Sequence, residues 1–321
     1  HAKAYLNNPH TRLVGVTSRT RASAEALVAE LGLHCKIYAD YEALLADDEV
    51  DVVSVTTPNH LHARDAIAAA RAGKHIVLEK PAGINEEELD ALEAAVAEAG
   101  VRSVMSYVLR WNQLVLNLKS LVQQGAFGEL FFCQTDYWHG VGEVIRADRW
   151  LARRQFAGSA MLTGGCHAVD MARNFCGEIE SVSAYSHNNP ALGFDYDTTT
   201  VASVRFASGA VGRISACLEI VAPYHFNIII MGTEGTAKGN QIWSRQLTPK
   251  QNGWVEIPCV CPDSGDVAHH PFQQEIDHLV ECVLDGRECV PNIADGVRTS
   301  RVCLAIDRSA QNGGRAERPN Y

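Results

Sequence analysis

A lysine in the segment Glu79-Lys80-Pro81 directly follows an apolar run, residues 75–78, that predicts a buried strand. At the carboxyl end of a strand, a lysine ammonium can lie in a cleft, hydrogen-bond a hydroxyl and stabilise developing oxyanion charge. With a lowered pKa it can also relay a proton. A lone lysine is usually a surface residue, but here Pro81 fixes the following backbone and Glu79 offers a carboxylate. Lys80 is therefore a candidate catalytic residue.

A histidine, His167, lies at the expected start of a helix in the segment Gly164-Gly165-Cys166-His167-Ala168-Val169-Asp170. Asp170 follows three residues later, on the same helical face. Histidine is the commonest general acid or base near neutral pH. Two interpretations fit this segment: a proton-transferring histidine, and a buried structural histidine held by Asp170.

A third polar segment, Thr56-Thr57-Pro58-Asn59-His60-Leu61-His62, follows the apolar run 52–55. Ligands of doubly wound sheets bind at the carboxyl ends of the strands, where this segment is expected to lie. The same residues also suit a plain helix start, with Asn59 as the N-cap and Pro58 stiffening the turn.

The elements that carry these segments alternate along the first half of the chain. Short apolar runs predict strands and the stretches between them predict helices; the strands are expected at 13–17, 37–38, 52–55, 75–78 and 101–105, and the helices at 22–31, 41–45, 59–71 and 86–99. Strand–helix alternation with short connections predicts parallel strands and right-handed crossovers. The nearly continuous Val, Ile and Leu runs indicate helices on both faces. We therefore predict an α/β fold that opens with a Rossmann-type doubly wound sheet.

The second half changes to a period of two residues, which predicts antiparallel strands. The strands are expected at 129–138, 181–187, 198–206, 210–219 and 225–231, and helices at 111–124, 271–284 and 293–311. An α+β domain with a large, open, mainly antiparallel sheet fits this order. The predicted domains are a dinucleotide-binding domain over residues 1–107 and a substrate-binding and oligomerisation domain over residues 108–321.

A dinucleotide-binding domain normally opens with a strand and a G-x-G-x-x-G turn. This sequence opens with His1-Ala2-Lys3-Ala4-Tyr5-Leu6, which is typical of the middle of the first helix, and the motif does not follow in a strand–turn–helix context. A sheet without its first central strand leaves backbone groups unpaired on both neighbours. We therefore expect a strand and its turn, roughly 15 to 25 residues, upstream of residue 1.

Composition narrows the class of protein. The 28 basic and 38 acidic residues leave a net charge of −10, which disfavours nucleic acid and anionic membranes as partners. The ten cysteines are scattered without a C-x-x-C pair, so we expect free thiols in a reducing compartment and no metal site. No apolar stretch reaches the roughly 20 residues of a spanning helix, and a signal peptide is absent. These features predict a cytoplasmic enzyme.

Taken together, the three segments resemble the Gfo/Idh/MocA oxidoreductases, the family that includes glucose–fructose oxidoreductase and inositol dehydrogenases. The similarity covers nearly the whole chain. Its most specific stretch joins a T-P-N-x-x-H turn at 57–62 to an E-K-P turn at 79–81, on consecutive strand ends. The opening hexapeptide also resembles the family's segment just after its glycine turn.

The resemblance implies a role for each segment. Lys80 resembles the family's catalytic-site lysine, and His167 its general acid/base, which accepts the hydroxyl proton as hydride leaves for the nicotinamide. The residues implied to line the cofactor are Thr56, Thr57, Pro58, Asn59, His62, Glu79, Lys80 and Pro81. Arg110 resembles an arginine that follows the last Rossmann strand and faces the cleft, near both cofactor and substrate.

One departure from the family concerns Thr163, because many members carry an aspartate four residues before the histidine. Threonine can hydrogen-bond a substrate hydroxyl but supplies no negative charge. The departure therefore leaves two alternatives open, a different sugar class or an altered mechanism. Asp170 lies within reach along the helix, although not at the matching position. Further substrate candidates are Trp138 and Trp150, with Tyr137, His139 and Arg149 near them in the sequence, because aromatic rings suit the apolar faces of a pyranose. The same tryptophans also suit a hydrophobic core.

The cofactor choice depends on the end of the second Rossmann strand, which here carries Thr17-Ser18-Arg19-Thr20. NAD-specific domains place an acidic residue there for the ribose 2′-hydroxyl, and none is present. Ser18 and Arg19 can instead receive a 2′-phosphate. If Arg19 only covers the adenine, NAD fits equally. We expect NADP or NAD, with NADP favoured.

The predicted function is an NAD(P)-dependent oxidoreductase that moves a hydride between the nicotinamide and a hydroxyl-bearing carbon of a sugar, sugar derivative or cyclic polyol. One alternative is redox-neutral glycoside cleavage through a transient keto-sugar. A non-catalytic sensor of nucleotide or sugar is the other, and the presence of both Lys80 and His167 argues against it. A homodimer or homotetramer is expected, because the open sheet face would otherwise expose apolar residues such as Val201, Val204, Val211 and Ile214.

Overall fold

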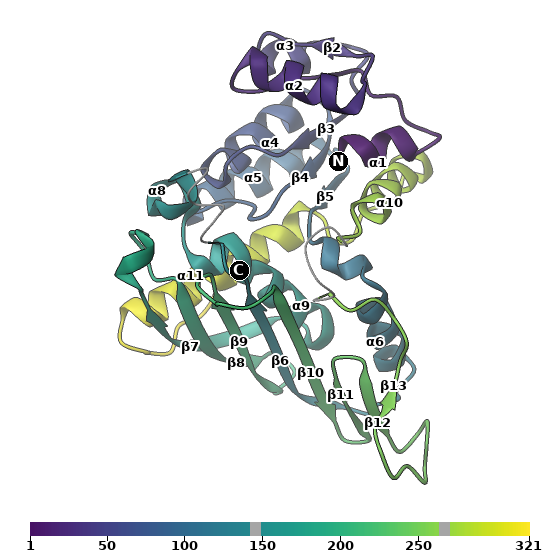
Figure 1. Ribbon diagram of the computed structural model, residues 1–321, viewed down its shortest axis with the longest axis vertical. Helices are drawn as coiled ribbons and strands as arrows, with labels where there is room; N and C mark the ends of the chain where they lie inside the picture. Colours follow the sequence, from purple (N-terminus) through teal and green to yellow (C-terminus); the bar gives the residue numbers. More distant parts are fainter. Residues whose placement is uncertain (142–148, 263–269) are drawn as a thin grey trace.

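The computed structural model in Figure 1 describes residues 1–141, 149–262 and 270–321. Its first part holds short parallel strands in two sheets. β1 (Gly15–Val16) pairs with β2 (Lys36–Ile37), and β3 (Val52–Val55), β4 (His75–Leu78) and β5 (Ser103–Met105) lie side by side in that order. The central strand β4 is buried along most of its length, as expected for a sheet covered on both faces.

Helices connect these strands, which confirms the Rossmann-type alternation. They are α1 (Ala2–Asn7), α2 (Arg21–Leu31), α3 (Tyr41–Leu45), η1 (Asn59–Leu61), α4 (His62–Arg71) and α5 (Glu86–Ala99). Three of them begin at polar N-caps whose side chains accept a backbone N–H, namely Thr20, Asp40 and Asn85. The capping role predicted for Asn59 is wrong, because α4 begins only at His62 and without a side-chain cap.

The second part is built on an eight-stranded sheet with the order β13-β12-β11-β10-β6-β9-β8-β7. Within the described strands of this sheet, all neighbours are antiparallel except β6 and β9. The mainly antiparallel sheet predicted from the sequence is therefore confirmed. Its strands are β6 (Leu130–Trp138), β7 (Ile179–His187), β8 (Thr199–Phe206), β9 (Val211–Cys217), β10 (His225–Gly232), β11 (Gly235–Lys238), β12 (Gln241–Ser244) and β13 (Val255–Glu256).

Helices cover one face of this sheet and join the two parts of the molecule (Figure 1). α9 (Cys166–Cys176) packs on β6, and α11 (Ile293–Gln311) packs on β7 and α9 and reaches α5. α10 (Phe272–Asp285) instead packs beside α1 and on the parallel sheet. The remaining helical segments are η2 (Val108–Trp111), α6 (Gln113–Gln123), η3 (Arg149–Ala152), α8 (Arg154–Ala157), η4 (Met161–Gly165) and η5 (Pro190–Leu192). Because α10 returns to the first part, a division at residue 107 stays a prediction.

The opposite face of the sheet is open, and alternation along the strands decides which residues it carries. Val201 and Val211 are exposed there as predicted. The prediction was wrong for Val204 and Ile214, which are 4% and 0% exposed because they point toward the helices. In the described part of the chain, no helix is both long and apolar enough to cross a membrane.

Candidate active site

Lys80 lies where β4 ends, at the edge between the two parts of the molecule. Its Nζ donates a hydrogen bond to the backbone carbonyl of Thr163 at 2.9 Å. Thr163 belongs to η4, a π-helical turn directly before α9, and such turns are frequent at functional sites. The Lys80–Pro81 peptide bond is cis. The turn after β4 thus places an ammonium group beside the start of α9.

His167 stands in the first turn of α9 and is 4% exposed. Its ring stacks on Tyr137 at 5.8 Å and meets the edge of Tyr107 at 6.0 Å. Within the described residues, its Nδ1 has no hydrogen-bond partner. Burial, the charge of Lys80 and the charge of His270 hold the pKa of His167 well below its usual value. At neutral pH the imidazole is therefore uncharged and able to accept a proton.

A glycine makes room for this arrangement. A Cβ on Gly164 would lie 2.2 Å from Cε1 of Tyr137, the ring that stacks on His167. The neighbouring Gly165 is equally confined, because its Cβ would meet Met161 and Ala216 at 2.8 and 2.9 Å. Gly164 thus allows η4 to pass directly against the tyrosine that stacks on the imidazole, and Gly165 allows it to pass close to Ala216.

The predicted partnership between His167 and Asp170 does not form. Asp170 is 1% exposed and its two carboxylate oxygens accept bonds from Nε and Nη2 of Arg110, at 2.9 and 2.6 Å. The pair joins η2, directly after the parallel sheet, to α9. Asp170 is therefore not available to a substrate, and two N–H groups of Arg110 are directed to Asp170 instead of to the cleft.

The T-P-N-x-x-H segment holds the cleft together from the other side. His62 is 1% exposed, and its ring nitrogens lie 2.7 Å from the carbonyl of Pro81 and 2.6 Å from that of Thr57. Asn59 donates to the carbonyl of Ala157 in α8 at 2.9 Å. These buried side chains tie the turns after β3 and β4 to each other and to the second part of the chain. Thr56 and Thr57 remain exposed at the edge, with Pro58 half-buried beside them.

Glu79 lies next to Lys80, and both of its carboxylate oxygens have hydrogen-bond partners. Its Oε2 accepts the backbone N–H of Lys80 at 3.2 Å, and its Oε1 lies 3.3 Å from Nε2 of His1. Burial opposes ionisation, but the hydrogen bond from His1 and the nearby positive charges leave the pKa of Glu79 below its usual value. Glu79 therefore adds a negative charge beside the ammonium of Lys80.

The structure separates the substrate candidates. Trp138 lies on the open face of the sheet, where its Nε1 donates to the hydroxyl of Ser215 at 2.9 Å. It therefore lies away from His167 and does not fit the role of a substrate ligand. Trp150 packs against the hydrophobic core, and Arg149 is exposed. The hydroxyl of Thr163 donates to Ala157 at 3.3 Å and is not directed by any contact toward Lys80.

Two further histidines lie near the site, one of which, His270, the sequence does not indicate. His139 lies 3.0 Å from the hydroxyl of Tyr137, and burial and the charge of Lys80 lower the pKa of His139. His270 lies 6.4 Å from the ring of His167. These residues come from separate strands and loops, so no local spacing marks them in the sequence.

The edge formed by the parallel strands suits a dinucleotide. Ser18 and Arg19 follow β1 and are exposed, and Arg19 has no ion-pair partner among the described residues. The exposed turn after β3 and the turn after β4 lie at the carboxyl edge of the second parallel sheet, and the unpartnered imidazole nitrogen of His167 faces no protein acceptor or donor in the described chain. The exposed polar side chains at this edge fit the phosphate, ribose and nicotinamide of NAD(P).

Comparison with known proteins agrees with this geometry. A family described as "Oxidoreductase family, NAD-binding Rossmann fold" matches residues 1–107, and one described as "GFO/IDH/MocA C-terminal domain" matches residues 115–238. Levoglucosan dehydrogenase of Pseudarthrobacter phenanthrenivorans is 31% identical over 85% of this chain and 81% of its own length. D-xylose 1-dehydrogenase (NADP(+)) 2 of Haloferax volcanii is 27% identical over 94% of this chain and 90% of its own.

The same likeness holds in three dimensions. A solved structure of levoglucosan dehydrogenase in complex with NADH superimposes with a TM-score of 0.85 and 25% identity, covering 96% of this chain and 90% of that one. Sequence, fold and the arrangement of strand ends lead to one assignment. The chain belongs to the Gfo/Idh/MocA family and is an NAD(P)-dependent oxidoreductase.

Proposed function

We propose that the chain oxidises a hydroxyl-bearing carbon of a sugar, sugar derivative or cyclic polyol, with Lys80 and His167 as its catalytic residues. This proposal is carried by the convergence of an ammonium group and an uncharged imidazole at one edge, from positions 87 residues apart in the chain. Among the described residues, the imidazole Nδ1 has no hydrogen-bond partner. Lys80 lies close enough to His167 for its charge to lower the pKa of the imidazole. The names of the two relatives above, which act on levoglucosan and D-xylose, support a carbohydrate substrate.

The proposed cofactor site uses the turns at the carboxyl ends of β1, β3 and β4. Ser18 and Arg19 would receive the adenosine end, and Thr56, Thr57 and Pro58 would lie along the dinucleotide, with Glu79, Lys80 and Pro81 near its reactive end. His62 and Asn59 support these turns through buried hydrogen bonds rather than through contact with the ligand. When bound, the nicotinamide supplies the acceptor for hydride.

The protein side of the reaction is a proton transfer. Lys80 hydrogen-bonds the substrate hydroxyl and stabilises the negative charge that develops on its oxygen. His167, uncharged at neutral pH, accepts the hydroxyl proton on an imidazole nitrogen. The reverse reaction returns this proton to a carbonyl oxygen. Tyr107 and Tyr137 hold the imidazole in place, so its orientation costs little during the reaction.

We favour NADP over NAD because Arg19 is exposed and uncommitted, and residues 17–20 contain no carboxylate for a ribose hydroxyl. Replacement of Arg19 by alanine should weaken NADP binding by about tenfold or more and leave NAD binding nearly unchanged, because a charge-assisted bond to phosphate contributes about 1.5–3 kcal/mol. Equal losses for both cofactors would contradict a 2′-phosphate contact.

The experiment that tests the function follows reduced nicotinamide by absorbance with a panel of monosaccharides, anhydrosugars, inositols and glycosides. Lys80→Met and His167→Ala should each lower kcat by about 100-fold or more with cofactor affinity retained. The exposed residues Lys250 and His187 provide matched controls, Lys250→Met and His187→Ala. Retained turnover in either site variant would contradict the assigned roles.

A redox-neutral reaction is the second candidate, favoured by the absence of a carboxylate at Thr163. In that case a glycoside is cleaved through a transient keto-sugar, and the aglycone is released while no reduced nicotinamide accumulates. A mass balance of aglycone against reduced cofactor separates the two reactions. Tight nucleotide binding with neither product would favour the sensor.

We also propose that the open sheet face forms the interface of a homodimer or homotetramer. It carries the exposed side chains of Tyr185, Val201 and Val211. Light scattering on Val201→Lys and Val211→Lys variants should show a smaller assembly than the unchanged protein, and an unchanged mass would contradict this interface.

A further inference from the structure

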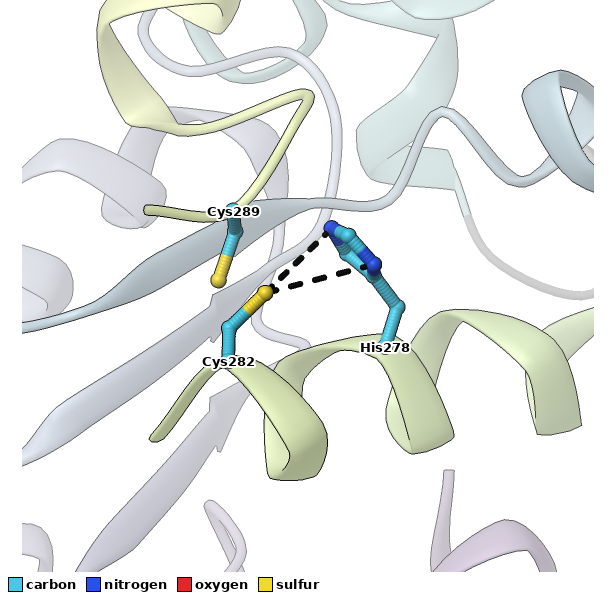
Figure 2. A group of neighbouring side chains, drawn as sticks. All are labelled: His278, Cys282 and Cys289. Atoms are coloured by element: carbon cyan, nitrogen blue, oxygen red, sulfur yellow. Dashed lines mark hydrogen bonds between the residues drawn. The ribbon is translucent and has the colours of Figure 1, made fainter. Parts of the chain in front are cut away.

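A histidine and two cysteines meet at the end of α10, away from the catalytic edge. His278 and Cys282 are four residues apart on one face of α10, and Cys289 returns from the loop that follows the helix. Figure 2 shows the imidazole facing the sulfur of Cys282, with the sulfur of Cys289 beside it. One ligand atom from each residue lies within 4.8 Å of the others.

The spacing of these atoms agrees with tetrahedral metal coordination. Zinc–sulfur bonds of about 2.3 Å and zinc–nitrogen bonds of about 2.0–2.1 Å, at a tetrahedral angle, place sulfur and nitrogen roughly 3.6 Å apart. Sγ of Cys282 lies 3.7 Å from Nε2 of His278. The same sulfur lies 4.0 Å from Nδ1, so it faces the ring instead of the Nε2 lone pair, and the imidazole must turn to direct that lone pair at an ion held by the sulfur.

The protonation state of His278 is also suitable. Its Nε2 accepts the backbone N–H of Val290 at 3.1 Å, so this nitrogen is unprotonated, which is the form that binds metal. A metal ion would replace that N–H as the partner of the lone pair. The ring of Trp111 packs against the imidazole, with the two ring centroids 5.6 Å apart.

The charges of the three side chains would balance those of a divalent ion at this buried site. Cys282 and Cys289 are both 0% exposed and pack in an apolar cluster with Ile276 and Leu279. Two thiolates and a neutral imidazole cancel the charge of a divalent cation, so the loaded site buries no net charge. His278 is half-buried, which leaves a solvent-facing position for a water molecule as the fourth ligand.

We propose that His278, Cys282 and Cys289 form a binding site for a soft divalent transition-metal ion of the zinc class. The spacing H-x3-C-x6-C differs from the C-x-x-C pairs on which the sequence prediction of no metal site depended. The ion would fix the loop between α10 and α11 to α10, adding to the bond from Arg102 to the carbonyl of Gly286 and replacing the bond that the thiol of Cys282 donates to the carbonyl of Glu288. This role is structural and independent of hydride transfer.

Cobalt titration of the reduced, metal-free chain tests the proposal. We expect one equivalent of Co²⁺ to bind, with a thiolate-to-cobalt charge-transfer band in the near ultraviolet, and zinc to displace it. Cys282→Ala and Cys289→Ala should each weaken binding at least tenfold, and Cys35→Ala, a half-buried cysteine beside β2, should not. X-ray absorption of the zinc-loaded, unsubstituted chain should show two sulfur ligands at about 2.3 Å, which needs no variant to fold.

Either of two results would overturn the site. The first is the absence of a charge-transfer band in the reduced, unsubstituted chain at saturating cobalt. The second is a zinc absorption spectrum with only nitrogen and oxygen ligands, which would place the bound ion elsewhere.

Discussion

The buried ion pair between Arg110 and Asp170 gives a prediction whose magnitude follows from its geometry. Asp170→Asn keeps the shape of the side chain and one acceptor oxygen but leaves the guanidinium of Arg110 without its counter-charge. The two side chains are 13% and 2% exposed, and both carboxylate oxygens are bonded, at 2.6 and 2.9 Å. Removing one partner of such a pair costs about 3–5 kcal/mol. Because the amide retains one bond, we expect a loss of about 3 kcal/mol in the free energy of unfolding.

Urea denaturation followed by tryptophan fluorescence measures this loss. The matched control is Asp285→Asn, which breaks an exposed aspartate–arginine contact to Arg287 at 3.2 Å and should cost less than about 1 kcal/mol. The double variant Arg110→Met/Asp170→Leu, which removes both charges, should recover much of the stability. A loss below about 1 kcal/mol for Asp170→Asn, or a double variant no more stable than the single one, would refute the reasoning.

Three further predictions concern pH and the packing of the site. Burial raises the pKa of Glu275 from 4.5 to about 7, so the folded chain binds a proton that the unfolded chain releases, and stability declines as pH rises from about 4.5 to 7. Relative to the unchanged chain, Glu275→Gln should therefore raise the free energy of unfolding by up to about 3 kcal/mol at pH 8 but little at pH 4.5. Urea denaturation at both pH values measures this difference, and an equal effect at both would contradict the reasoning. Because the pKa of His167 is lowered, kcat/KM for oxidation should stay level as pH falls through 6.5 and decline only below it, and a decline centred at or above 6.5 would argue against His167 as the base. Gly164→Ala should displace Tyr137 from His167 and lower kcat on the order of 100-fold, with cofactor binding retained by fluorescence titration; unchanged kcat would show that the ring contact is dispensable.

The sequence predicts those site residues whose position depends on a single strand or helix. Lys80 and the T-P-N-x-x-H segment each follow a short apolar run, and parallel strands bring their carboxyl ends to a common edge. His167 precedes a clear helical pattern, and α11 was predicted with its observed bounds, Ile293–Gln311. In these places local pattern and tertiary position agree.

Partners that are distant along the chain could not be predicted in this way. The alternation of β6 indicates two faces but not which face the helices cover. The sequence therefore offers Trp138 as a substrate or core candidate, although it lies on the open side. Likewise, Asp170 is within helical reach of His167, yet both of its carboxylate oxygens accept bonds from Arg110, 60 residues upstream. The parallel pairing of β6 with β9 depends on strand order, which hydrophobic period does not encode.

Two of the contacts between the candidate catalytic edge and the second part of the chain end on backbone oxygens. Lys80 donates to the carbonyl of Thr163, and Asn59 donates to that of Ala157. A main-chain acceptor is present whichever amino acid occupies the position. Mutation can therefore exchange the side chain at 163 during divergence while the lysine keeps its anchor. The attachment between the two parts of the chain is thus insensitive to the identity of the residue that provides it.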